Sequence, residues 1–170
     1  MSWKRAIVAA LAVCVLLLTG AAGCGSGGAQ ERGTVVSPSP VGKVLDNTDD
    51  DGRHYREVDK KGAPVVGVEV QPDADGSWDV RLKLANFRLS QSGDPAKAVT
   101  GHGTARLYVD GQPVADLRTR AYRIPAGYLP HGTHQVTARL YADDGTVWAV
   151  EGKPVQSTAA ITVSEPSPSP

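Results

Sequence analysis

The sequence predicts an all-β domain, built as an antiparallel β-sandwich of seven or eight short strands. Three observations support this prediction. Between residues 64 and 163, apolar and polar side chains alternate with a period of two, which is typical of strands with one buried face. Glycine-containing turns separate the alternating stretches. Outside the first 23 residues, no apolar side chains recur at the spacing of an amphipathic helix.

The first half of this region supplies two strands and a continuation of the second. Residues 65–70 form the expected first strand, and a turn that ends at Gly76 follows it. Residues 78–84 alternate between apolar and charged side chains, which predicts the second strand. Phe87 and Leu89 continue the apolar face one residue out of phase, so we expect a bulge just before them.

The second half of the region predicts the other strands. Asp110-Gly111 supplies the residues that tolerate positive φ in a tight hairpin, and a second turn ends at Gly145. The expected strands around these turns are 105–109, 114–117, 136–141, 146–150 and 157–163. Their number and spacing are typical of an immunoglobulin-like sandwich.

The N-terminus has the three parts of a secretory signal peptide. Lys4 and Arg5 precede an apolar run of thirteen residues, 6–18, and small residues follow. A helix of this length spans about 20 Å, less than the ~30 Å hydrocarbon core of a bilayer. The stretch Ala21-Ala22-Gly23-Cys24 resembles the lipobox of bacterial lipoproteins. This resemblance implies that residues 1–23 are a lipoprotein signal peptide and that Cys24 carries a lipid whose acyl chains include palmitate. The alternative is ordinary cleavage near Ala22 with release of the protein.

The cysteines agree with a lipid anchor. The chain has two, and Cys14 lies in the apolar run that cleavage removes. Cys24 would then be alone at the mature N-terminus, without a partner for an internal disulfide. Glycine, serine, proline and charged residues dominate residues 24–62, which predicts a flexible tether before a sandwich domain at 63–164. The Ser-Pro repeat at 165–170 predicts a disordered tail.

A second resemblance concerns the sandwich domain. The stretches Gly103–Gly111, Ile124-Pro125, His131–His134 and Glu151–Val155 resemble motifs of small exported bacterial β-sandwich domains of unassigned function. The resemblance implies the same fold and a location outside the cytoplasm. Family members carry histidines where this chain has Thr104 and Arg106, so a metal site of the family type is not expected here.

Composition and motifs narrow the function. The 18 basic and 18 acidic residues give a formal net charge of zero, so no basic stripe for nucleic acid is expected. The sequence contains no P-loop, no G-x-S-x-G elbow and no dinucleotide-binding glycine pattern. We therefore expect a non-catalytic protein without a cofactor. A divergent envelope hydrolase is one alternative.

Two other groups of residues are candidate sites. His102, His131 and His134 are weak candidates for a copper or zinc site, and a metal-binding extracytoplasmic protein is the other alternative. The stretch 47–52 begins like a calcium loop but lacks the glutamate that should follow, which favours a solvated acidic linker.

Aromatic side chains predict a recognition surface, because five of them fall on exposed strand positions, strand ends or loops. They are Tyr108, Tyr122, Tyr128, Tyr141 and Trp148. The alternative is that they cover a sheet. The sequence thus predicts a lipid-anchored protein of the cell envelope, on the extracytoplasmic face of the membrane. Its domain binds or scaffolds an envelope protein or glycan.

Overall fold

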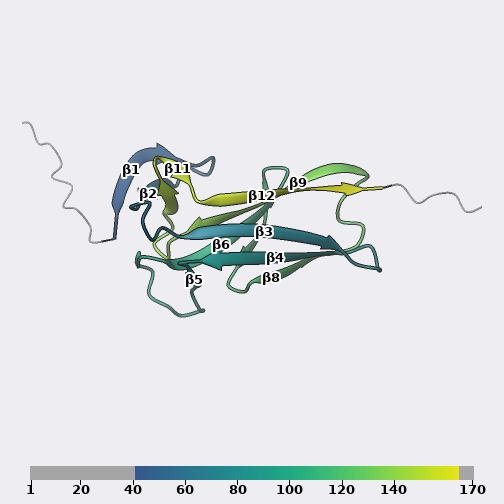
Figure 1. Ribbon diagram of the computed structural model, residues 1–170, viewed down its shortest axis with the longest axis horizontal. Coiled ribbons are helices and arrows are strands. Elements are labelled where there is room, and N and C mark those ends of the chain that lie inside the picture. Colours follow the sequence, from purple (N-terminus) through teal and green to yellow (C-terminus); the bar gives the residue numbers. More distant parts are fainter. Residues whose placement is uncertain (1–40, 165–170) are drawn as a thin grey trace, which may run out of the picture. The chain divides into compact units, whose positions relative to one another are not determined.

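The computed structural model describes residues 41–164, and every regular element in that range is a strand. The all-β prediction is therefore confirmed for this part of the chain. No helix of those residues is long and apolar enough to cross a membrane. Figure 1 labels most of the strands, which are β1 (Lys43–Thr48), β2 (His54–Glu57), β3 (Val65–Pro72), β4 (Trp78–Ala85), β5 (Arg88–Leu89), β6 (His102–Val109), β7 (Gln112–Leu117), β8 (Ala121–Ile124), β9 (Gly132–Tyr141), β10 (Val147–Val150), β11 (Lys153–Pro154) and β12 (Gln156–Val163).

The larger sheet is built around β9. Along one side of β9, residues 132–139 pair antiparallel with β12; along the other, residues 136–141 pair antiparallel with β6. From β9 the sheet continues through β10 and β2 to β1, while β5 and β7 pair with β6 and β11 pairs with β10. This sheet has nine strands. It holds most of the residues discussed below.

A smaller sheet of three strands, in the order β3-β4-β8, shares its core with the larger one. Val80 and Leu82 of β4 belong to the same buried cluster as residues of β6, β9 and β10. The largest buried side chains include Trp148, Leu107, Ile124 and Leu140. Burying an aliphatic side chain of this size contributes about 1.5–3 kcal/mol. The alternating pattern identified Val80, Leu82, Leu107 and Leu140 as core residues, whereas the burial of Trp148 and Ile124 was not predicted.

The predicted hairpin after β6 is confirmed. Asp110 and Gly111 have φ values of 49° and 81°, and they connect β6 to β7. Asparagine, aspartate and glycine are the residues that tolerate this left-handed backbone.

The strand number and the pairing differ from the prediction. The described residues form twelve strands instead of seven or eight, and two pairs are parallel, β10 with β2 and β5 with β6. The bulge expected before Phe87 is a change of sheet: Asn86 has a φ of 53°, and the chain leaves β4 of the smaller sheet to pair as β5 with β6 of the larger. Phe87 and Leu89 are out of phase because they face the core from another sheet.

The expected tether from 24 to 62 is wrong for its second part. Residues 43–57 form β1 and β2, which pair with each other and with β10. A buried arginine fixes β2: Arg56 donates to Thr146 Oγ1 at 3.0 Å, to the Val41 carbonyl at 3.2 Å and to Asp144 Oδ2 at 2.6 Å. Of the charged residues in this segment, Asp49 and Arg56 are buried against the sheet, whereas most of the others are exposed. The predictions of a signal peptide at 1–23, of lipid on Cys24, of a tether over 24–40 and of a tail at 165–170 concern residues outside the described range.

The described chain begins and ends at opposite ends of β9. Lys43 pairs with Glu57, which pairs with Ala149 of β10 near the Tyr141 end of β9. At the other end of β9, Val163 pairs with Gly132. The ten residues of β9 span about 33 Å at ~3.3 Å per residue.

Candidate functional site

Two of the five predicted surface aromatics are buried in a polar cluster on the outer face of the larger sheet. Tyr108 and Tyr141 are 7% and 4% exposed, and their hydroxyl groups are hydrogen-bonded to each other. Leu107 and Leu140, the neighbours of these tyrosines, belong to the core between the sheets. Successive side chains of a strand point to opposite faces, so both tyrosines lie on the outer face, as predicted. They are nevertheless buried because the loop between β1 and β2 covers them.

Asp49 of that loop is the centre of the cluster. Its side chain is 0% exposed, and its Oδ2 accepts a hydrogen bond of 3.0 Å from the Tyr141 hydroxyl. Because Tyr141 donates its proton to Asp49, Tyr108 is the donor to Tyr141. The Asp49 Oδ1 accepts the backbone N–H groups of Asp51 at 3.1 Å and Arg53 at 2.9 Å. The solvated acidic linker expected at 47–52 is thus a docked loop whose third residue points into the protein.

Arginines complete the cluster. The guanidinium carbons of Arg53 and Arg106 lie 5.0 and 5.4 Å from the centre of the Tyr141 ring, and that of Arg139 lies 5.1 Å from the Tyr108 ring. Burial raises the pKa of the Tyr141 phenol. The tyrosine therefore stays neutral at physiological pH, and the cluster acts as a structural clamp on the β1–β2 loop.

The remaining predicted aromatics lie apart from that pair and from one another. Trp148 is 0% exposed in the core, and its indole N–H donates to the His102 carbonyl at 3.1 Å. Tyr122 is half-buried against the core and lines a shallow pocket along β4 and β8. Tyr128, in the loop before β9, is 52% exposed. The predicted contiguous aromatic surface is therefore wrong, because three of its five members are buried.

The three histidines proposed as weak metal ligands do not converge. His102 begins β6, and His134 lies on β9 beyond the far end of that strand, next to Asp110. The seven residue steps from His102 to Val109, at ~3.3 Å each, separate the two histidines by more than about 20 Å. No group of three histidine, cysteine or acidic side chains positioned for a metal ion occurs within residues 41–164. The alternative of a metal site built from these three histidines is therefore contradicted, because the register of β6 and β9 separates His102 from His134.

His134 has a structural role instead. Its Nδ1 lies 2.7 Å from Asp110 Oδ2, and its Nε2 lies 2.9 Å from the Pro130 carbonyl. Both partners are acceptors only, so both ring nitrogens must carry protons, as in the imidazolium form. The hydrogen bond to Asp110 raises the pKa of His134, and the same bond lowers the pKa of Asp110. The charged histidine thereby ties the loop before β9 to the β6–β7 hairpin.

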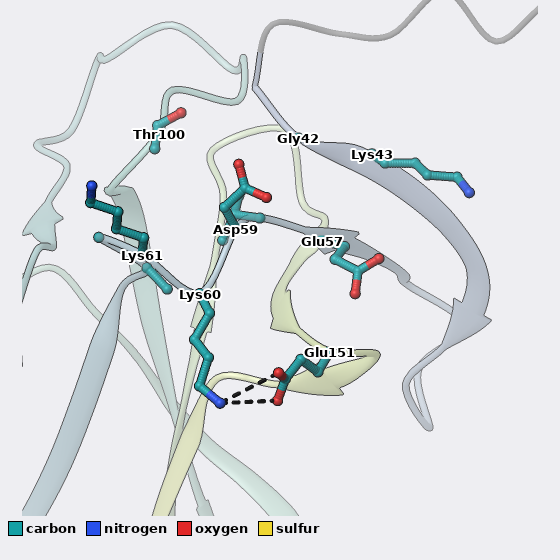
Figure 2. A pocket seen from close by; sticks show the side chains of 11 residues that line it. Gly42, Lys43, Glu57, Asp59, Lys60, Lys61, Thr100 and Glu151 are labelled. Carbon is teal, nitrogen blue, oxygen red and sulfur yellow. Dashed lines mark hydrogen bonds and ion pairs between the residues drawn. The ribbon is translucent and has the colours of Figure 1, made fainter.

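One open pocket lies at the end where the described chain begins. It has a volume of about 550 Å³, and Figure 2 shows its lining, with Lys60 reaching toward Glu151 at 3.4 Å. Three lysines and three acidic residues balance one another in this lining: Lys43, Lys60, Lys61, Glu57, Asp59 and Glu151. Exposed ion pairs of this type contribute about 0–1 kcal/mol. The pocket is polar and electrically balanced, and its geometry favours no ligand charge.

A second pocket lies at the opposite end of β9 and has a different chemistry. It has a volume of about 380 Å³ and is formed by the β3–β4 turn, the start of β4, the β8–β9 loop and the end of β12. We call it the Trp78 pocket; its lining residues are Gly76, Trp78, Pro125, Gly127, Leu129, Pro130, His131 and Val163. Apolar rings and aliphatic groups dominate this lining. The alternation over residues 78–84 predicts a strand that begins at Trp78, but it does not indicate this pocket.

Pro130 connects this pocket to the charged histidine. Its carbonyl accepts the hydrogen bond from His134, and its ring is part of the pocket lining. The density of proline, glycine and aromatic residues at 125–132 is the sequence signal that was available for this loop. Ligand sites are concave and mostly apolar with few polar groups, which makes the Trp78 pocket the better candidate of the two.

The hydrolase alternative requires a nucleophile beside a base. Within residues 41–164, the side-chain hydrogen bonds of histidine run to the Leu45 carbonyl, Asp110 and the Pro130 carbonyl, not to a serine or threonine hydroxyl. No family model, curated protein or solved structure matches the chain. The resemblances to lipoproteins and to exported β-sandwich domains therefore stay predictions.

Proposed function

We propose that the protein is a lipid-anchored, non-catalytic binding module of the cell envelope, attached to the membrane through Cys24. In this proposal the two sheets form an immunoglobulin-like sandwich that binds an envelope protein or glycan at the Trp78 pocket. The single core shared by the two sheets supports the sandwich. The N-terminal pattern of charge, apolar run and cysteine supports the anchor.

The observation that carries the binding role is the position of the pocket. The described chain begins near the Tyr141 end of β9, and the Trp78 pocket lies at the Gly132 end. A domain anchored through residues before Gly42 thus has its most apolar pocket about 33 Å from the point of attachment.

The experiment has two arms. In the first, radiolabelled palmitate is supplied to cells that express the protein or Cys24→Ser, and the membrane fraction is analysed. Labelling that depends on Cys24 supports the anchor, and an unlabelled or uncleaved protein contradicts it.

In the second arm, a photoreactive amino acid replaces either Tyr128, beside the pocket, or Lys43, at the other end. Intact cells are illuminated and the adducts compared. An adduct that forms from position 128 but not from 43, and is lost with Trp78→Ala, supports ligand binding at the pocket. Equal adducts from both positions, or none, contradict it.

A further inference from the structure

The lining of the Trp78 pocket matches a particular class of ligand. Trp78, Pro125 and Pro130 supply rigid apolar rings, and Leu129 supplies an aliphatic side chain that is 8% exposed. Among the lining side chains, only those of Trp78 and His131 carry hydrogen-bond donors. Clefts with apolar rings and isolated donors bind polyproline II segments, which present proline rings and carbonyl groups that have no internal hydrogen bonds.

The chain itself contains such a segment close in sequence to a lining residue of the pocket. Residues 165–170 read Glu-Pro-Ser-Pro-Ser-Pro, and they follow Val163, which is part of the pocket lining, after a single residue. Val163 pairs with Gly132, the residue after His131 of the same lining. The segment therefore starts at the rim of the pocket.

Length and tethering favour occupation of the pocket by this segment. Six residues in the polyproline II conformation extend about 19 Å, enough to cross a cleft of about 380 Å³. A short tether also gives a segment an effective concentration on the order of a millimolar at its site. A weak interaction is then sufficient to fill the pocket from the same chain.

We propose that the Trp78 pocket recognises proline-containing extended chain, and that residues 165–170 of the same molecule occupy it. This inference rests on the binding role proposed for this pocket and names the chemistry of its ligand. A proline-rich partner binds by displacing the chain's own segment.

Tryptophan fluorescence tests the occupation. The full chain has three tryptophans, and in a Trp3→Phe background only Trp78 and the fully buried Trp148 remain. Acrylamide reaches the buried indole of Trp148 only slowly. The constant for quenching of the protein's fluorescence by acrylamide therefore reports mainly on Trp78. Replacing the three prolines of residues 165–170 by alanine should raise this constant at least twofold. Replacing Ser167 and Ser169 by alanine should leave it unchanged, since the proline rings remain.

Three results would overturn the proposal. The first is an unchanged quenching constant in the proline variant, and the second is an equal rise in the serine variant. The third is a constant of the Trp3→Phe protein that rises on tenfold dilution, which would show that a second copy fills the pocket. An acetylated Ser-Pro-Ser-Pro-Ser-Pro peptide, added to the proline variant at several millimolar, should restore the low quenching constant. If this peptide leaves the constant unchanged, that result also contradicts recognition of proline-containing chain by the pocket.

This experiment is independent of the test of the anchor. The quenching constants do not depend on Cys24, and palmitate labelling does not depend on residues 165–170. A failed quenching experiment therefore removes self-occupation of the pocket, whereas a failed labelling experiment removes the anchored location.

Discussion

Replacing Asp49 tests whether the segment before residue 63 belongs to the folded domain. In Asp49→Ala, the Tyr141 hydroxyl and the backbone N–H groups of Asp51 and Arg53 lose their acceptor. The Asp49 side chain is 0% exposed, so water does not replace the carboxylate without opening the loop. The β1–β2 loop should then separate from the sheet.

The magnitude follows from these contacts. A hydrogen bond to a charged group contributes about 1.5–3 kcal/mol, and a buried hydroxyl left without a partner costs about 1–3 kcal/mol. The two backbone N–H groups regain water once the loop opens, so the contributions do not add fully. We expect Asp49→Ala to lower the free energy of unfolding by about 3–5 kcal/mol, as for other broken buried charge networks. That is a large part of the 5–15 kcal/mol or so that stabilises a typical domain.

Urea unfolding followed by circular dichroism measures the effect, with two variants for comparison. Asp49→Asn keeps a carbonyl acceptor of the same size and should lose about 1–2 kcal/mol. Asp50→Ala changes an exposed neighbour and should stay within about 0.5 kcal/mol of the wild type. If Asp49→Ala is as stable as Asp50→Ala, the loop does not clamp the sheet and the docked position of β1 and β2 is refuted.

Three further predictions concern the sheet, the charged histidine and the core. In Gly103→Ala, with a φ of +145°, the new Cβ would lie 1.8 Å from the Tyr141 carbonyl oxygen, so thermal unfolding should show a loss of more than about 3 kcal/mol. Gly111→Ala, with no atom within 4 Å of its Cβ, should lose only about 1–2 kcal/mol; equal losses would contradict the close approach of β6 and β9. The raised pKa of His134 means that its bond to Asp110 stabilises the fold fully below the ordinary histidine value of 6.5, and that this stability is lost as pH rises through the raised value. The lowered pKa of Asp110 means that its carboxylate stabilises the fold fully above the ordinary aspartate value of 3.8. This stability is lost as pH falls through the lowered value. The urea midpoint should therefore be higher at pH 5.5 than at pH 9, and His134→Gln should remove most of this difference. If the difference persists in His134→Gln, the pH dependence comes from other groups. Trp148→Ala should cost about 3–5 kcal/mol and abolish the near-ultraviolet circular dichroism of the core, whereas a loss below about 1 kcal/mol would show that Trp148 is not in the core.

Much of the strand pattern could be predicted from the sequence. The alternation at 78–84 and 136–141 and the Asp110-Gly111 hairpin all appear in the structure. These features depend on neighbouring residues, through the two-residue period of a strand and the φ values that aspartate and glycine tolerate. The predicted phase of Tyr108 and Tyr141 was also correct, since both lie on the face opposite the core.

The candidate site was less predictable, because it depends on contacts between distant segments. Nothing near Tyr141 in the sequence indicates that Asp49 covers it, since 92 positions separate the two residues. His102 and His134 are separated by strand register, and the Trp78 pocket joins the β3–β4 turn, the β8–β9 loop and the end of β12, which are far apart in the chain.

The sequence by itself determined that this is a strand-built domain, where its main turns lie and which faces of residues 78–84, 105–109 and 136–141 point to the core. The tertiary structure decided which outer faces are covered, that residues 43–57 belong to the sheet, and where the apolar pocket lies. The reason is physical: backbone conformation and side-chain period are set by adjacent residues. Burial of a polar or aromatic side chain on an outer face is set by whichever distant segment packs over it.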